Sequence, residues 1–128
     1  MNSKQKILLI EDDKMLLEMY SSKFNREGYD IVTAENGSDG LKLAKENKPD
    51  LILLDIILPK LDGFATLKEI RGDANIKNTP VILLTNLGQD QDIQKGKALG
   101  ADDYFVKANH TPTEVVEKVR ELLKSKGK

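Results

Sequence analysis

The chain has 128 residues, which is the size of a single domain and long enough to bury one hydrophobic core. It contains no cysteine, so disulfides and thiolate metal sites are excluded. The net charge is −1 and charges of both signs are interspersed, so we expect no nucleic-acid partner. The apolar runs are too short to span a membrane and the N-terminus lacks a signal-peptide pattern, which predicts a cytoplasmic protein that does not bind membranes.

Five short apolar runs predict β-strands, and the segments between them have the apolar spacing of helices. The strands are expected at residues 6–10, 30–34, 51–55, 81–85 and 104–106. The apolar helical faces are Leu17, Tyr20 and Phe24, then Phe64, Leu67 and Ile70, and finally Val115, Val119 and Leu122. NGS at 36–38, DG at 62–63 and TP at 111–112 are typical of helix starts. Three of the strands are almost continuously apolar, which favours a parallel sheet with helices on both faces.

The alternation of strands and helices indicates an α/β fold, a (βα)₅ domain of three layers. No linker or repeat interrupts the pattern, so we expect one domain over residues 1–128, with a core at about 5–124 and a short, flexible, basic tail, KSKGK. The weakest predicted helix is Gln89–Leu99, because it contains Gly96 and few apolar anchors. It is either a short surface helix or a mobile regulatory one.

Polar side chains that could carry chemistry follow the ends of four predicted strands. They are Glu11, Asp12 and Asp13 after the first strand, Asp55 at the end of the third, Thr85 at the end of the fourth and Lys107 after the fifth. The carboxyl ends of parallel strands share one edge of the sheet, where open α/β sheets bind their ligands. Each residue alone would be an ordinary loop or cap residue, whereas their convergence at one edge indicates a site.

Converging carboxylates repel each other unless a cation lies among them. Oxygen ligands without histidine or cysteine favour Mg²⁺, which takes one or two carboxylates and keeps several waters. Mg²⁺ and a lysine beside a strand-end aspartate suit phosphoryl transfer, because both neutralise the phosphoryl oxygens while the carboxylate attacks. Asp13 and Asp62 are better explained as helix-start residues than as metal ligands.

Four motifs carry a family resemblance. LLIEDD, LLDIILPKLDG, ILLTN and DDYFVK resemble, in order and spacing, the CheY-like receiver domain of two-component response regulators, and the similarity covers essentially the whole chain. The resemblance implies a doubly wound, flavodoxin-like sheet of five parallel strands in the order 2-1-3-4-5.

The resemblance also implies roles for individual residues. It makes Asp55 the phosphoacceptor of a two-component phosphorelay. The hydroxyl of Thr85 would bond the phosphoryl group, and Lys107 would pair with Asp55 and then with the phosphate. Tyr104 matches the switch aromatic, whose ring turns inward when Thr85 moves. The implied Mg²⁺ ligands are Asp12, Asp55, the backbone carbonyl of Ile57 and, through water, Glu11.

The chain departs from the family pattern next to the lysine. Family members commonly have a proline there, joined by a cis bond, but Lys107 is followed by Ala108. A cis bond to a residue other than proline costs about 2.5–4 kcal/mol. The Lys107–Ala108 bond is therefore either trans or a strained bond that the site holds.

The sequence favours a stand-alone phospho-receiver. Such a protein would accept a phosphoryl group from a histidine kinase or a phosphotransfer protein, and would catalyse this transfer and a slow autodephosphorylation without being a classical enzyme. It would signal to a protein target through residues 89–106 and the last helix.

The alternatives explain less of the sequence. A non-phosphorylated binding module on the same fold would not need the complete set of acids, hydroxyl and lysine. A flavoprotein is disfavoured because EDDKM after the first strand would repel a phosphate. A phosphatase of the haloacid-dehalogenase type would carry its nucleophilic aspartate after the first strand with a second two residues on, which EDD does not match.

Overall fold

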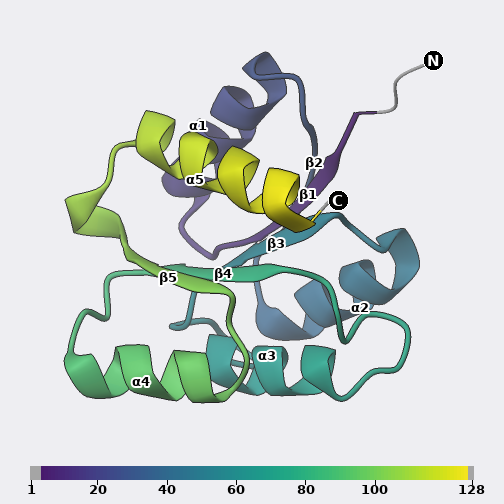
Figure 1. Cartoon of the computed structure of the whole chain (residues 1–128), viewed down its shortest axis with the longest axis vertical. Coiled ribbons are helices and arrows are strands. Elements are labelled where there is room, and N and C mark those ends of the chain that lie inside the picture. Colours follow the sequence, from purple (N-terminus) through teal and green to yellow (C-terminus); the bar gives the residue numbers. More distant parts are fainter. Residues whose placement is uncertain (1–3, 127–128) are drawn as a thin grey trace.

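The computed structural model describes residues 4–126 and has three layers, with a parallel sheet between two layers of helices (Figure 1). The strands are β1 (Lys6–Ile10), β2 (Asp30–Ala34), β3 (Leu51–Leu54), β4 (Val81–Thr85) and β5 (Asp103–Val106). The helices are α1 (Lys14–Arg26), α2 (Gly37–Asn47), α3 (Gly63–Arg71), α4 (Asp90–Ala98), the 3₁₀ helix η1 (Lys107–Asn109) and α5 (Pro112–Lys126).

The five strands are parallel and lie in the order β2-β1-β3-β4-β5, which confirms the expected topology. Three strands have the predicted bounds. The third ends one residue early, at Leu54, and the fifth begins one residue early, at Asp103. Both differences are at strand ends, where pairing stops gradually. The N–H of Asp55, one residue past β3, still donates to the Ile10 carbonyl of β1.

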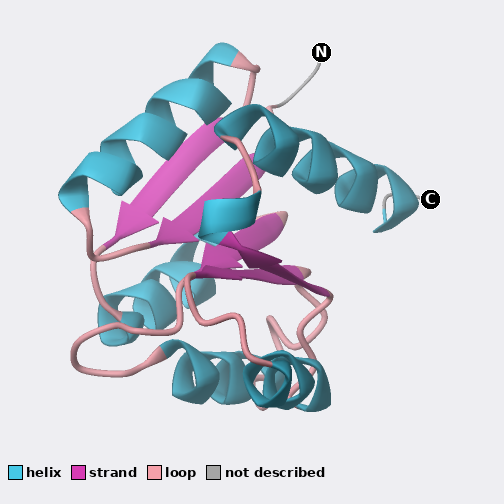
Figure 2. Cartoon of the chain, turned by 90° about the vertical axis from the view of Figure 1, so that its left-hand side faces the viewer, coloured by secondary structure: helices cyan, strands magenta, loops and turns pink. Residues whose placement is uncertain are grey.

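The two faces of the sheet carry separate hydrophobic clusters. Side chains of α1 and α5 pack on one face, with Phe24, Tyr20 and Val119 among the buried residues. Side chains of α2 and α3 pack on the other, where Leu67 and Ile70 lie fully buried and α4 adds Leu99 at its end. Figure 2 shows the helices on both sides of the sheet. Strands covered on both faces must be apolar throughout, which explains the uninterrupted runs in β1, β3 and β4.

The predicted helix starts are confirmed by their capping bonds. The side chain of Asp13 accepts from the amides of the first turn of α1, Asn36 accepts from the N–H of Asp39, and Asp62 accepts from the N–H of Ala65. Thr111 and Glu114 form reciprocal bonds, a capping box, at the start of α5. These bonds satisfy amide donors that have no partner within the helix.

Helix α4 has the weakest local anchoring, as its sequence predicts. Its N-cap, Gln89, makes no capping bond through its side chain, and Gly96 is the one buried residue of the helix. The other four α-helices carry two to four buried residues each. Within residues 4–126, no helix is long and apolar enough to cross a membrane.

The first three residues of the expected basic tail belong to helix α5. Helix α5 continues to Lys126, so Lys124, Ser125 and Lys126 belong to it, and the last two residues of KSKGK lie outside the described residues. Lysines in a last turn interact favourably with the helix dipole. Lys126 also lies 3.2 Å from a carboxylate oxygen of Asp102, which holds the end of the helix against the start of β5.

Candidate functional site

Backbone pairing places two acids side by side at the carboxyl edge of the sheet. The N–H of Glu11 donates to the Ala34 carbonyl of β2, and the N–H of Asp55 donates to the Ile10 carbonyl of β1. Hydrogen bonding between the strands therefore continues one residue past β1 and β3, and it fixes the backbone from which both carboxylates project.

The segment after Asp55 is held by a close approach of helix α3. The N–H of Gly63 donates to the Ile56 carbonyl, and a Cβ at position 63 would lie 2.1 Å from the Asp55 carbonyl oxygen. Only a glycine allows this contact. The DG pair at 62–63, predicted as a helix start, thus also holds the backbone at Asp55 and Ile56 in place.

Lys107 joins the two acids. Its Nζ atom lies 2.8 Å from Oδ2 of Asp55 and 2.5 Å from Oε1 of Glu11. The exposed fractions of these three side chains are 10% or less, so the pairs are shielded from solvent. The remaining oxygens also have partners, because Oδ1 of Asp55 accepts from the N–H of Ile56 and Oε2 of Glu11 accepts from the N–H of Asp13. Both carboxylates are thus fixed in direction.

Burial and the interactions between neighbouring charges shift the pKa values of Glu11 and Lys107. Burial raises the pKa of Glu11, and the hydrogen bond from Lys107 offsets this only in part while the charge of Asp55 adds to it. Burial alone would lower the pKa of Lys107, but its hydrogen bonds to Asp55 and Glu11 outweigh that effect and the pKa lies above its ordinary value. One ammonium serves two acids, so the site has a surplus of negative charge.

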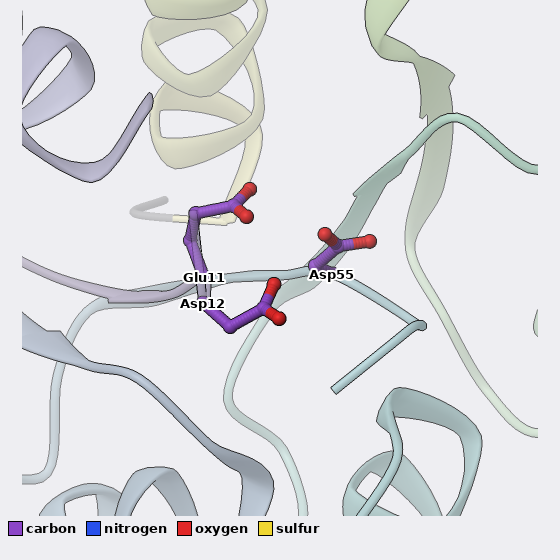
Figure 3. A group of neighbouring side chains, drawn as sticks. All are labelled: Glu11, Asp12 and Asp55. Atoms are coloured by element: carbon purple, nitrogen blue, oxygen red, sulfur yellow. The ribbon is translucent and has the colours of Figure 1, made fainter. Parts of the chain in front are cut away.

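The acids converge as a metal site requires. Oxygen atoms from Glu11, Asp12 and Asp55 all lie within 4.8 Å of one another (Figure 3). Asp12 is exposed, whereas the other two are buried. In Figure 3 the Glu11 and Asp12 carboxylates both point toward the side on which Asp55 lies. Three hard oxygen donors with excess negative charge fit Mg²⁺. The fourth implied ligand is the carbonyl of Ile57, a residue that lines the same cleft.

These acids and the remaining predicted residues line one cleft of about 270 Å³. Its lining includes Glu11, Asp12, Asp13, Leu16, Asp55, Ile57, Thr85, Asn86, Leu87 and Lys107. Thr85 is fully buried, and its Oγ1 accepts a long bond of 3.4 Å from the N–H of Leu87. All the predicted acids, the hydroxyl and the lysine thus face one opening. Larger clefts elsewhere on the described residues contain neither Asp55 nor Lys107.

Tyr104 lies beside the cleft but does not line it. Its hydroxyl donates a hydrogen bond to the carbonyl of Leu87, two residues past Thr85. Burial, with the charges of Asp92 and Asp55, raises the pKa of Tyr104 to about 12. The phenol is therefore a neutral hydrogen-bond donor at physiological pH, and its ring position is tied to the loop that follows Thr85.

Three features of the site were not predicted. Glu11 receives a bond from Lys107 that is shorter than the one Asp55 receives, and Leu87 supplies the acceptor for Tyr104. The segment after β5 turns at once into η1, so Lys107 is the first residue of a 3₁₀ helix. None of the described peptide bonds is cis, so the Lys107–Ala108 bond is trans, which decides the question left open by the sequence.

Comparisons with known proteins agree with this geometry. The family model for the response regulator receiver domain matches residues 7–120. The chain is 41% identical to the DNA-binding dual master transcriptional regulator RpaA of Synechocystis, over 93% of this chain and 49% of that protein. The receiver domain of Francisella response regulator 1452 superposes with a TM-score of 0.88 at 33% identity, covering 96% of this chain and 99% of that one.

A further solved structure is relevant to the cluster of Glu11, Asp12 and Asp55. The receiver domain of the sensor histidine kinase PA1611 from Pseudomonas aeruginosa, described with a magnesium ion coordinated in its active-site cleft, superposes with a TM-score of 0.87 at 27% identity. It covers 95% of this chain and 99% of that one.

The chain belongs to the response regulator receiver domain family of two-component systems. Phosphorylation and Mg²⁺ binding at an acidic pocket are general in this family, and its members interact with histidine kinases and with effector targets. The chain spans about half the length of the curated relatives it matches. The expectation that no nucleic acid is involved gains no support from these relatives, because one is named as DNA-binding.

Proposed function

We propose that Asp55 of this chain accepts a phosphoryl group from the phosphohistidine of a histidine kinase or a phosphotransfer protein. The observation that carries the proposal is the position of the Asp55 carboxylate, which faces a cleft while Lys107 holds one of its oxygens at 2.8 Å. A structural ion pair would not need an opening to solvent or a convergence of further acids and a hydroxyl on it.

The proposed transfer is a single displacement. A carboxylate oxygen of Asp55 forms a bond to phosphorus as the bond from phosphorus to the donor imidazole nitrogen breaks, and that nitrogen leaves with the bonding electron pair. The donor ring carries a proton on its other nitrogen, so it leaves as neutral imidazole, and the site supplies cations and hydrogen-bond donors to the phosphoryl oxygens. Lys107 supplies the ammonium and Thr85 a hydroxyl at the same cleft.

The acids of the cleft would hold a cation for this step. Asp12, Asp55, Glu11 and the Ile57 carbonyl are the proposed Mg²⁺ ligands, and bound Mg²⁺ would neutralise phosphoryl oxygens during transfer. Lys107 orients the Asp55 side chain, because it donates to one oxygen while the N–H of Ile56 donates to the other. The nucleophile is thus already in place before a donor arrives.

The rim of the cleft suits a protein donor. Ile57 lines the cleft with 63% of its surface exposed, and Met15, in the first turn of α1 beside the capping residue Asp13, is 81% exposed. Exposed large apolar side chains next to a polar cleft are typical of contact surfaces. A donor helix that carries the phosphohistidine could cover both side chains while its imidazole reaches Asp55.

The proposed output is a change of shape. A phosphoryl group on Asp55 would offer new acceptors to Thr85 and Lys107, and movement of Thr85 would alter the loop to Leu87 that holds the Tyr104 hydroxyl. The signal would reach a protein target through the face built by α4, β5 and α5.

A second output is favoured by the names of the relatives, which are transcriptional regulators. In a protein of their kind the same face would contact a DNA-binding segment instead of a separate target. The described domain would then regulate DNA binding without contacting DNA itself, since its charges are balanced. Both outputs share the proposed chemistry at Asp55.

Phosphoramidate tests the proposed transfer, because its phosphorus–nitrogen bond resembles that of phosphohistidine. The purified chain is incubated with phosphoramidate and Mg²⁺, and its intact mass is measured. We expect one added phosphoryl group, and none without Mg²⁺. The matched control is Asp62→Asn, which alters an acid that caps α3 outside the cluster and should leave labelling unchanged. A chain that gains no phosphoryl group under any of these conditions would refute the proposal.

A further inference from the structure

Helix α2 contacts the β3–α3 loop (residues 55–62) through the backbone of Gly37, its first residue. A Cβ at this position would lie 1.8 Å from the carbonyl oxygen of Leu61 and 2.3 Å from Oγ1 of Thr66. Both distances are far shorter than atoms in close-packed interiors allow. The nearer atom belongs to the backbone, so no side chain can turn aside to make room. Only a glycine therefore lets α2 approach the loop at this point.

The same Leu61 carbonyl is also held by helix α3. The Thr66 side chain is fully buried, and its hydroxyl lies 2.8 Å from the Asp62 carbonyl oxygen and 3.3 Å from that of Leu61 as a donor. The side chain of Asp62 in turn caps α3. The end of the β3–α3 loop is thus enclosed between the first turns of two helices, α2 and α3.

The part of the loop that carries the Ile57 carbonyl lies between two fixed ends. At the first end, the carbonyl of the residue before Ile57 accepts from the N–H of Gly63. At the second end, the Leu61 carbonyl meets Gly37. The Ile57 side chain is 63% exposed, so its own packing does not orient the backbone there. Lys60 has a φ of 68°, a conformation that a residue other than glycine keeps only where its surroundings impose it. The two ends therefore determine the shape of the loop.

A methyl group at position 37 would displace the loop more readily than the helix. The start of α2 is fixed by Asn36, whose buried side chain makes two capping bonds within the first turn. Gly40 packs on β1 so closely that a Cβ there would lie 2.4 Å from Cδ1 of Ile10. The loop, in contrast, is exposed over most of residues 57–60. The cost of a side chain at position 37 therefore falls on the loop.

We propose that Gly37 is a positioning residue for the Mg²⁺ site. By admitting α2 to the Leu61 carbonyl, it fixes the far end of the loop and thereby orients the Ile57 carbonyl toward the acids. This inference rests on the proposed function, in which that carbonyl is a metal ligand. Gly37 itself does not line the cleft, so a change there reaches the site only through the loop.

The experiment compares Gly37→Ala with Gly40→Ala. Both add a methyl group to a buried glycine of α2, but the nearest atoms at position 40 all belong to the Ile10 side chain and none to the loop. Calorimetry follows Mg²⁺ binding. Amide exchange without metal follows the N–H of Gly63, which donates to the loop, relative to the amides of β4.

We expect Gly37→Ala to bind Mg²⁺ about tenfold more weakly, as when groups that support metal ligands are altered. The Gly63 amide should also exchange faster relative to β4, because the loop that accepts its bond has shifted. Gly40→Ala should lose stability but change neither quantity. An unchanged exchange ratio in Gly37→Ala, or equal weakening of Mg²⁺ binding by Gly40→Ala, would overturn the inference.

Should Gly37→Ala not fold, Thr66→Val loosens the same contact by removing the hydroxyl without adding bulk. It should weaken Mg²⁺ binding, whereas Thr66→Ser keeps the hydroxyl and should bind as the wild type does. Wild-type affinity in Thr66→Val would overturn the inference. A wild-type chain that binds no Mg²⁺ would instead refute the metal ligands of the proposed function, because the exchange of Gly63 is measured without metal.

Discussion

The Lys107 ammonium lies 2.8 Å from a carboxylate oxygen of Asp55, although 52 positions separate the two residues in the sequence. The same nitrogen lies 2.5 Å from Glu11, so one cation compensates acids that follow two other strands. A carboxylate at the end of a buried strand would be costly without such a partner. The position of Lys107 therefore determines both the stability of this edge and its chemistry.

Replacing Lys107 by Met should destabilise the fold at pH 7, because Glu11 and Asp55 would face each other without a cation. The expected loss is about 1–3 kcal/mol, since water can enter the cleft and limit the cost of the unpaired charges. Urea unfolding measures it. Mg²⁺ should restore more stability to Lys107→Met than to the wild type, because it replaces the missing positive charge. The matched control is Lys118→Met, which alters an exposed lysine of α5. Equal stability of the two variants would contradict the role assigned to Lys107.

Asp12 and Asp13 should differ in their effects on Mg²⁺ binding. Asp12 belongs to the oxygen cluster, whereas the side chain of Asp13 caps α1 through the N–H groups of Met15 and Leu16. We expect Asp12→Asn to weaken Mg²⁺ binding by about tenfold or more. Asp13→Asn retains a capping oxygen and should bind Mg²⁺ almost as the wild type does. Calorimetric titration distinguishes them, and the reverse order of affinities would refute the ligand assignment.

The stability of the fold should fall at high pH through Tyr104. Its pKa is raised from about 10 in the unfolded chain to about 12 in the folded one, so the neutral phenol stabilises the fold below pH 10. This contribution is lost as the pH rises from about 10 through about 12. Tyr104→Phe cannot ionise and should show a shallower loss of denaturant midpoint over this range. The titration step near pH 12 should also vanish from its absorbance curve. A step near 12 that persists in Tyr104→Phe would assign it to another tyrosine.

The phosphorylated state should be long-lived. Ile57 and Leu87 both line the cleft, and neither side chain can orient a water molecule through a hydrogen bond. Ile57→Asn combined with Leu87→Glu would supply such groups and should hasten hydrolysis by about tenfold or more, because positioning the attacking water is a large part of catalysis. The assay follows decay of the phosphorylated chain after the donor is removed, in saturating Mg²⁺. The pair Ile57→Leu and Leu87→Ile keeps both sites apolar and should decay like the wild type. Loss of the phosphoryl group from the wild type within seconds would show that this account of the lifetime is wrong.

Most of the fold could be predicted because the three central strands, β1, β3 and β4, are buried on both faces. The bounds of β1, β2 and β4 were predicted to the residue, and capping residues at Asn36 and Asp62 marked two helix starts. The bounds of β3 and β5 differed by one residue, since pairing fades at strand ends. At the end of α5, Lys126 contacts Asp102, a distant residue that no local pattern in the sequence indicates.

The candidate site could be assembled from the sequence only in outline. A parallel sheet brings strand ends to one edge, which was enough to place Asp55, Thr85 and Lys107 at a common cleft. Lys107 makes a shorter hydrogen bond to Glu11 than to Asp55. This difference depends on side-chain packing, which the spacing of residues in the sequence does not reveal. The hydrogen bond from Tyr104 to the Leu87 carbonyl could not be predicted either. The sequence shows only that Leu87 lies two residues past Thr85, the threonine at the end of β4.

The site of phosphoryl attachment tests the central claim most directly. The chain is labelled with acetyl phosphate in Mg²⁺, and tandem mass spectrometry of its peptides identifies the residue that carries the group. We expect the group on Asp55 alone, and no labelled peptide from Asp55→Asn, even though Glu11, Asp12 and Lys107 remain in that variant. A phosphoryl group on any other residue of the wild type, or full labelling of Asp55→Asn, would contradict the assignment of Asp55 as the acceptor.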